Sequence, residues 1–221
     1  MPRPKAKRTF DTLRFSIEAE VEYPNTKDSS KLIEKHRIIR GWDISYDGSL
    51  DNGSEYKPKD KNKLYWNEDC IDQIKEIIGL IKAHKGNSGN GTAGLHCHID
   101  MSQFSYKEIC NIVKAFIKQQ NKIYKQFNVL KCRYDYAQKI PKNTLKYITE
   151  NNIKKVKDGS DSCRDINEYL CERHYGLNIL ALEKYNTLEF RFFNSSIQIS
   201  NIKRAIKFCL NFCLDNAKGG K

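Results

Sequence analysis

Residues 13–23 (LRFSIEAEVEY) alternate between apolar and polar side chains, which is the period of a β-strand with one buried face. One side of the predicted strand is apolar and consists of Phe15, Ile17, Ala19 and Val21. The opposite side carries three carboxylates, those of Glu18, Glu20 and Glu22. The chain therefore begins its fold with a strand that presents an acidic stripe opposite its core face.

Two later stretches repeat this design. In GLHCHIDMS (94–102), the residues Leu95, Cys97, Ile99 and Met101 would face the core, and the other face would carry His96, His98 and Asp100. In TLEFRFF (187–193), Leu188, Phe190 and Phe192 would lie opposite Glu189 and Arg191. Three predicted strands thus share an apolar face and an ionisable face.

A hairpin is predicted between the first strand and these later ones. WDISYDGSL (42–50) contains Asp47-Gly48, a dipeptide typical of tight turns, and GSEYK (53–57) would return as the second strand. The hairpin adds the carboxylates of Asp47 and Glu55 to those of the first strand.

Three amphipathic helices follow from the spacing of apolar residues. Asn67 is the predicted N-cap of a helix that ends near KAHKG (82–86). Ser105 and Glu108 form a capping-box signature ahead of a second helix, and residues 202–213 carry apolar side chains at helical spacing.

The remaining segments are patterned more weakly. Residues 137–163 are polar and rich in lysine, and we interpret them as an excursion with short helical pieces within one domain. DINEYLCERH (165–174) predicts a short helix. YGLNILALEK (175–184) and TLEFRFF (187–193) are predicted to be two strands joined through residues 185–186.

Length and composition fit a cytoplasmic protein with one α+β domain at residues 13–215, preceded by a basic flexible tail at residues 1–12. The chain has 221 residues, of which 39% are hydrophobic, enough to bury a sizeable core. Its eight cysteines form no C-x-x-C pair and lie in apolar stretches, as reduced core cysteines do. No apolar run is long enough to cross a bilayer, and no signal-peptide core is present.

The formal net charge of +12 favours phosphate-bearing or acidic partners. Much of this excess lies in MPRPKAKR (1–8), in KPKDKNK (57–63) and in the lysines of residues 139–157. We interpret these runs as solvated tail or loop.

Each ionisable motif alone has an ordinary structural explanation, such as a wetted sheet face for E-x-E-x-E or histidines bonded to backbone for H-x-H. Together they indicate more, because sheet packing would crowd several carboxylates into one basin, where mutual repulsion favours a bound cation. Carboxylate ligands with one or two imidazoles suit Mg²⁺ or Mn²⁺.

The motifs also resemble a known family. GNGTAGLHCHIDMS and LEFRF are similar to the H-x-H and E-x-R strands of glutamine synthetase. The order E-x-E, D-G-S with a nearby Glu, H-x-H, L-N and E-F-R resembles the amidoligase family of the glutamine synthetase and glutamate-cysteine ligase superfamily. This resemblance covers residues 13–213 and implies a curved, mainly antiparallel sheet with helices packed on one face. It also implies an ATP-dependent ligase that joins a carboxylate to an amine through an acyl phosphate.

The resemblance implies two divalent metal positions next to the triphosphate of ATP. Glu18 and Glu20 would hold different ions. Glu55 would complete one position, and His96 with Glu189 would complete the other.

Catalytic roles are implied for Arg191, Glu189 and Glu55. Arg191 would neutralise the phosphoryl group during its transfer, and His98 would contact a nucleotide phosphate. The GNSGNG loop (86–91) is a candidate for gripping an amino-acid or peptide substrate, and a flexible connection is the alternative.

A further phosphate-binding arginine is expected between H-x-H and E-x-R. Arg133, Arg164 and Arg173 all qualify, and each is equally compatible with a surface position; we favour Arg173. Asp47 and Asn178 are candidates for lining the substrate basin, and Asp47 is also a candidate for completing the Glu55 metal position.

Two other classes of function share some of these features. A metal-dependent nuclease would also combine carboxylates, histidines and a basic surface, but no nuclease signature is present. A non-enzymatic nucleic-acid-binding protein would use the charge excess and the 12 tyrosines, which do not cluster with the basic runs. The P-loop signature G-x-x-x-x-G-K-[ST] is absent, so ATP would bind through the metal-lined sheet.

Overall fold

The computed structural model describes residues 8–24, 30, 38–39, 41–47, 50, 52–59, 64–89, 91–159 and 172–219. The predicted helix at 165–174 and the Gly48 position of the predicted turn lie largely or wholly outside these ranges. Residues 8–12 include a short 3-10 helix, η1 (Phe10–Thr12), and the Arg8 guanidinium pairs with the Glu108 carboxylate.

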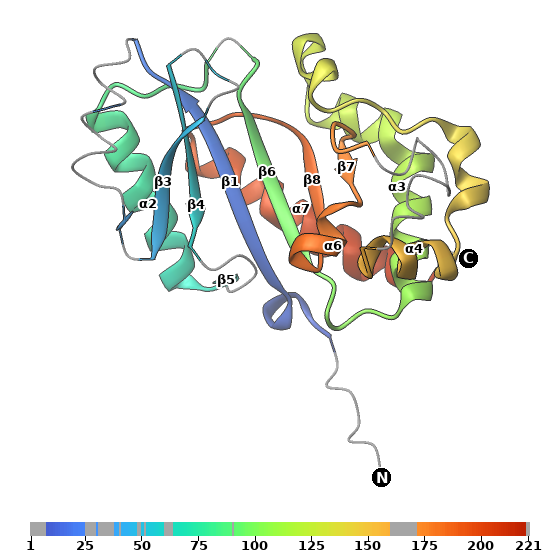
Figure 1. The fold of residues 1–221 in the computed structure, drawn as a ribbon. Coiled ribbons are helices and arrows are strands. Elements are labelled where there is room, and N and C mark those ends of the chain that lie inside the picture. The colour runs from blue at the N-terminus through green and yellow to red at the C-terminus, as the bar shows by residue number, and fades with distance from the viewer. Residues whose placement is uncertain are drawn as a thin grey trace.

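The centre of the fold is an open antiparallel sheet (Figure 1). Its strands are β1 (Arg14–Glu22), β2 (Ile38–Ile39), β3 (Trp42–Asp47), β4 (Gly53–Pro58), β5 (Leu64–Tyr65), β6 (Gly94–Asp100), β7 (Leu177–Asn178) and β8 (Thr187–Asn194). The strand order is β2-β3-β4-β1-β6-β8-β7, and β5 pairs with the start of β1. The strands β1, β6 and β8, which the sequence predicts to share one design, are therefore neighbours in the middle of the sheet.

The helices complete an α+β fold, as predicted. They are α2 (Glu68–Ala83), α3 (Tyr106–Gln126), α4 (Glu150–Lys157), α6 (Ala181–Tyr185) and α7 (Ile199–Ala217), with 3-10 helices η2 (Lys131–Asp135) and η3 (Lys142–Tyr147). In Figure 1, α2 and α7 lie behind the sheet. The predicted caps are confirmed, because the Asn67 side chain accepts a hydrogen bond from the Cys70 backbone N–H at 2.8 Å, and Ser105 and Glu108 form a capping box.

The core lies between the helices and the apolar face of the sheet. Strand residues such as Ile17, Cys97 and Phe190 are buried there against the apolar sides of α2, α3 and α7. Of the described cysteines, Cys132 is exposed and the other five are buried, and all six are free thiols. In the described part of the chain, no helix is both long and apolar enough to span a membrane.

Phe116 on α3 is the residue whose removal should destabilise this core most clearly. Its ring is fully buried and lies 5.8–6.2 Å, centroid to centroid, from those of Phe190, Phe192 and Phe212. We expect Phe116→Ala to lower the free energy of unfolding by about 3–5 kcal/mol, because the substitution leaves a cavity between α3, β8 and α7. Urea denaturation measures this loss. Leu130→Ala, at a side chain that is 46% exposed, is the control and should change stability by less than about 1 kcal/mol; equal losses in the two variants would contradict the described packing.

The prediction of a long strand over residues 175–184 is wrong. Only Leu177 and Asn178 form a strand, β7, and the chain then turns into the short helix α6. The turn begins at Asn178, whose side-chain oxygen accepts a hydrogen bond from the Leu180 backbone N–H at 3.0 Å. Helix α6 ends at Asn186, which adopts a left-handed conformation with φ of 55°.

Candidate active site

The cross-strand register brings the ionisable side chains of the central strands onto one face. Glu18 on β1 is paired with His96 on β6, and His98 on β6 is paired with Glu189 on β8. On the other side of β1, Glu20 is paired with Glu55 on β4. Directly paired residues in a sheet project to the same side, so these residues form one polar face opposite the core.

Glu18, His96, His98 and Glu189 form a buried cluster, which we call the imidazole–carboxylate cluster. Nδ1 of His96 lies 3.6 Å from Oε2 of Glu18 and 3.4 Å from Oε1 of Glu189. Nε2 of His98 lies 3.4 Å from Oε1 of Glu18 and 3.9 Å from Oε1 of Glu189. Among the described residues, one group of three acidic, histidine or cysteine side chains is arranged to hold a metal ion: Glu18, His98 and Glu189.

Both histidines of the cluster have ring nitrogens that lack a hydrogen-bond partner. Within the described part of the chain, this holds for Nδ1 and Nε2 of His96 and for Nε2 of His98, all of them buried. Nδ1 of His98 is 3.0 Å from the Thr187 hydroxyl, a contact that orients the ring so that Nε2 faces the carboxylates. Buried polar atoms normally have partners, so these three nitrogens mark a place suited to a ligand.

The imidazoles hold the carboxylates of the cluster in their charged form. Burial alone would raise the pKa of Glu18, but the imidazoles of His96 and His98, which lie 3.4–3.6 Å from its oxygens, outweigh it, and the pKa is lowered. The pKa of Glu189 is also lowered, because the nearby side chains of His98, His96 and Arg191 outweigh the effect of burial. Two anionic oxygen donors therefore face two imidazoles in a space that is largely shielded from water.

Glu20 and Glu55 border this cluster but have different surroundings. One oxygen of Glu20 accepts a hydrogen bond from the Gly94 backbone N–H at 2.6 Å and lies 3.8 Å from Nη1 of Arg133. The carboxylate of Glu55 pairs with the Lys57 ammonium group. Burial and the charge of Glu18 raise the pKa of Glu55 to about 7, against the opposing effect of Lys57.

Arg191 reaches the cluster from β8, close to a β-bulge. The register between β6 and β8 shifts between Leu95 and Cys97, so that β8 has one extra residue opposite β6. Nη1 of Arg191 donates to Oε1 of Glu189 at 2.6 Å. The Arg191 backbone carbonyl accepts from Nη2 of the buried Arg133 at 3.1 Å, so a second arginine anchors the bulged strand.

Two cavities open on this polar face. One, of about 310 Å³, is lined by Glu18, Glu20, Tyr46, Asp47, Glu55, Thr92, His96, Arg133, Tyr136, Arg173, His174 and Arg191. The other, of about 570 Å³, is lined by Glu18, His98, Arg173, Asn178, Leu180, Ala181, Glu183, Lys184, Tyr185, Glu189 and Arg191. They share Glu18, Arg173 and Arg191, and together they include the site residues proposed from the sequence apart from Asp100, Arg164 and the GNSGNG loop, whose described residues (86–89 and 91) line neither cavity.

Asp100 and Arg164 are not placed in this site. The Asp100 carboxylate accepts a hydrogen bond from Nε of Arg14 at 2.8 Å and two more from Ser102, away from the cluster. Arg164, one of three candidate phosphate-binding arginines, lies outside the described residues, as does Asn90 of the GNSGNG loop. The other two candidate arginines, Arg133 and Arg173, both line the smaller cavity.

Sequence reasoning missed several residues that line or support the site. Thr187 orients His98, and the small cavity also includes the side chains of Tyr46, Tyr136 and His174. Lys57 was assigned to a solvated basic run, but its side chain is 25% exposed and engages Glu55. The position of Lys57, two residues after Glu55 on a predicted strand, was the available signal for this pairing.

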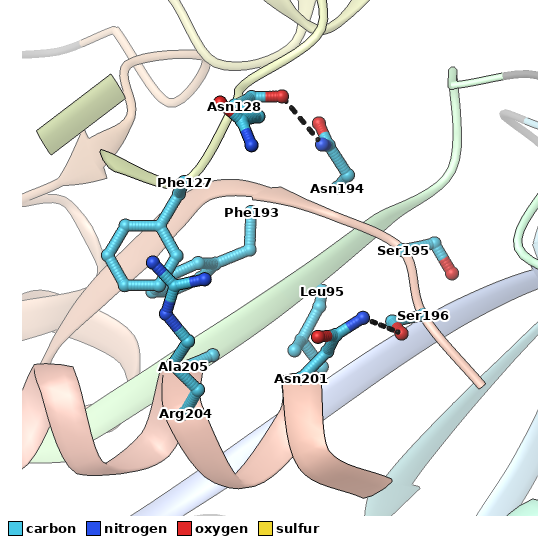
Figure 2. A pocket seen from close by; sticks show the side chains of 10 residues that line it. All are labelled: Leu95, Phe127, Asn128, Phe193, Asn194, Ser195, Ser196, Asn201, Arg204 and Ala205. Carbon is cyan, nitrogen blue, oxygen red and sulfur yellow. Dashed lines mark hydrogen bonds between the residues drawn. The ribbon is translucent and has the colours of Figure 1, made fainter. Parts of the chain in front are cut away.

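A third cavity, shown in Figure 2, involves the other side of β6. It has about 260 Å³ and includes Leu95, Phe127, Phe193 and Arg204 among its lining residues. Leu95 belongs to the core face of β6, and none of the site residues proposed from the sequence lines this cavity. The candidate chemistry is therefore confined to the opposite, polar face.

The imidazole–carboxylate cluster on one face of the open antiparallel sheet is a candidate metal centre. Residues 5–213 match the sequence model of the family described as "Putative amidoligase enzyme". The chain belongs to this family, and its membership indicates a ligase. No curated protein and no solved structure matches the chain significantly.

Proposed function

We propose that the protein is an ATP-dependent carboxylate–amine ligase that forms an amide or isopeptide bond. Transfer of the γ-phosphoryl group of ATP to the carboxylate gives an acyl phosphate and ADP. The amine nitrogen then attacks the acyl carbon, the C–N bond forms, and phosphate leaves while the nitrogen loses a proton. The observation that carries this proposal is the buried imidazole–carboxylate cluster beside Arg191, in a chain of the amidoligase family.

The cluster fits a divalent cation. The partnerless nitrogens of His96 and His98 and the charged carboxylates of Glu18 and Glu189 supply the donor types that Mg²⁺ or Mn²⁺ accept. These four side chains would hold one ion. The paired residues Glu20 and Glu55 lie at the second metal position that the family resemblance implies. When bound, such ions screen the phosphate oxygens and the anionic carboxylate from each other.

Arg191 is the residue we assign to the transferred phosphoryl group. Its hydrogen bond to Glu189 fixes one edge of the guanidinium, and the side chain lines both cavities. Nε of Arg191 is buried and, within the described structure, has no hydrogen-bond partner. A guanidinium held in place before the reaction stabilises the charge of phosphoryl transfer without reorganising.

The remaining lining residues divide into groups suited to different parts of the substrates. Arg173 lines both cavities and is our candidate for a further phosphate contact, whereas Nε2 of His98, for which the family resemblance implies a phosphate contact, is assigned to the ion instead. Asp47 lines the 310 Å³ cavity of the polar face and Asn178 lines the 570 Å³ cavity, and both are candidates for contacting the carboxylate or amine substrate. Asn178 also donates to Oε2 of Glu189 at 2.7 Å, which fixes the second oxygen of that carboxylate.

The test incubates the purified full-length protein with ATP, Mg²⁺ and pools of amino acids or short peptides. We expect ADP to form only when a carboxylate and an amine are both present, with a product lighter than their sum by one water. ADP release that is indifferent to both substrates would contradict the proposal. Cleavage of DNA or RNA by the protein with Mg²⁺, without ATP, would establish the nuclease alternative instead.

A further inference from the structure

Lys57 occupies a place beside Glu55 where the family resemblance implies a metal ion. Its ammonium group pairs with Oε2 of Glu55, two positions earlier on β4 and therefore on the same face of the sheet. Across the β3–β4 pairing, Lys57 stands directly opposite Asp43. Lys57 thus lies between two acidic positions, and its side chain is only 25% exposed.

The two implied metal positions consequently differ in the number of positively charged side chains next to their carboxylates. At the Glu20–Glu55 position, Lys57 pairs with Glu55, and the Arg133 guanidinium lies 3.8 Å from Glu20. Glu20 also uses one of its oxygens to accept the Gly94 backbone N–H. These contacts engage one oxygen of each carboxylate, Oε2 of Glu20 and Oε2 of Glu55, and a second ion would have to compete with the cationic groups for them.

The imidazole–carboxylate cluster is different, because donor atoms there remain without partners. Of the three ring nitrogens without a hydrogen bond, Nδ1 of His96 and Nε2 of His98 face Glu18 and Glu189, and Nε2 of His96 lies 3.4 Å from Oε1 of Glu20. Within the part of the chain that the structure describes, the group of side chains positioned to hold a metal also lies here and does not include Glu20 or Glu55. The cluster therefore offers donor atoms to one ion, whereas the carboxylates of Glu55 and Glu20 already lie next to positively charged side chains.

We propose that the Lys57 ammonium group takes the place of the second divalent ion at Glu55. This chain would then bind one divalent ion where the family resemblance implies two. The inference rests on the proposed function, because it takes the imidazole–carboxylate cluster as the site of the first ion. An ammonium group and a divalent ion repel each other and compete for the same carboxylate oxygens. Removing this single positive charge should tighten divalent binding at Glu55 by about tenfold or more.

The test counts bound Mn²⁺ per chain by equilibrium dialysis of the full-length protein without nucleotide, at neutral pH. We expect one Mn²⁺ for the wild type and a second for Lys57→Met, which keeps an unbranched side chain as far as the ε position and removes the charged ammonium group. Lys57→Arg keeps the charge and should bind one. Lys59→Met, at an exposed lysine on the same segment, lowers the net charge equally and should also bind one. Adding Glu55→Gln to Lys57→Met should abolish the second ion.

The outcomes separate this inference from the proposed function. Two ions in the wild type, or one ion in both the wild type and a folded Lys57→Met variant, would overturn the role of Lys57 and leave the ligase proposal standing. No ion in the wild type would overturn the metal site itself and the Lys57 inference with it. One Mn²⁺ in the wild type and two in Lys57→Met, without amide formation in the ligase assay, would support the inference about Lys57 and contradict the proposed reaction. Circular dichroism establishes that each variant is folded, and Lys57→Gln provides a second neutral variant.

Discussion

Arg191→Ala is expected to abolish amide formation and leave the fold intact. Arg191 is the one arginine bonded to a carboxylate of the cluster, within the described residues, and its side chain lines both cavities. Loss of an arginine that stabilises the transferred phosphoryl group lowers turnover by about 10³- to 10⁵-fold. The backbone N–H and carbonyl of Arg191, which bond to Gly176 and Arg133, are retained in the variant.

The measurement is the rate of ADP release in the presence of both substrates, together with thermal unfolding to establish that the variant folds. Arg191→Lys keeps the charge but loses the planar fork, so we expect it to recover only part of the rate. Arg204→Ala is the matched control, because Arg204 lies against Phe127 in the cavity of Figure 2, away from the cluster. A folded Arg191→Ala variant with wild-type turnover would refute the role of this residue.

Glu18→Gln is expected to remove most divalent-ion binding and, with it, amide formation. Glu18 lies 3.4–3.6 Å from ring nitrogens of both histidines and lines both cavities, so it occupies the centre of the site. Glutamine keeps the size of the side chain but removes the negative charge that those imidazoles and a cation share. Binding of Mn²⁺ should weaken by about a hundredfold or more, because even residues that only support metal ligands contribute 10- to 100-fold.

Isothermal titration of Mn²⁺ into the two proteins measures this change. Glu22→Gln is the control on the same strand and face, since Glu22 accepts a hydrogen bond from the Thr92 hydroxyl at 3.0 Å and is not part of the cluster. We expect Glu22→Gln to bind Mn²⁺ with nearly the wild-type affinity. Wild-type Mn²⁺ affinity in a folded Glu18→Gln variant would show that the ion is held elsewhere in the protein.

The faces of the central strands follow from the sequence because side chains alternate strictly along a strand. Glu18, His96 and Glu189 could each be assigned to a polar face from local pattern alone. Periodicity alone does not tell which strands are neighbours in the sheet. The expectation that these three residues converge came from the order of the motifs and from the family resemblance. The pairing of Glu18 with His96, and of His98 with Glu189, is a property of the three-dimensional register.

Other features depended on contacts between distant segments and were not predictable in the same way. Residues 179–185 have an apolar pattern compatible with either a strand or a short helix, and the Asn178 side-chain bond to Leu180 decides between them. Arg133 and Arg173 were indistinguishable in sequence, because no period relates them to the central strands. In the structure Arg133 is buried against backbone carbonyls, whereas Arg173 lines both cavities.

The most direct test of the account is a crystal structure of the protein soaked with Mn²⁺, with the ion located by its anomalous scattering. We expect a peak on the polar face of the sheet, within about 2–2.5 Å of carboxylate oxygens of Glu18 and Glu189 and of an imidazole nitrogen of His96 or His98. Strong anomalous density elsewhere, with these four side chains unliganded, would contradict the proposal that this cluster is the metal centre of the ligase.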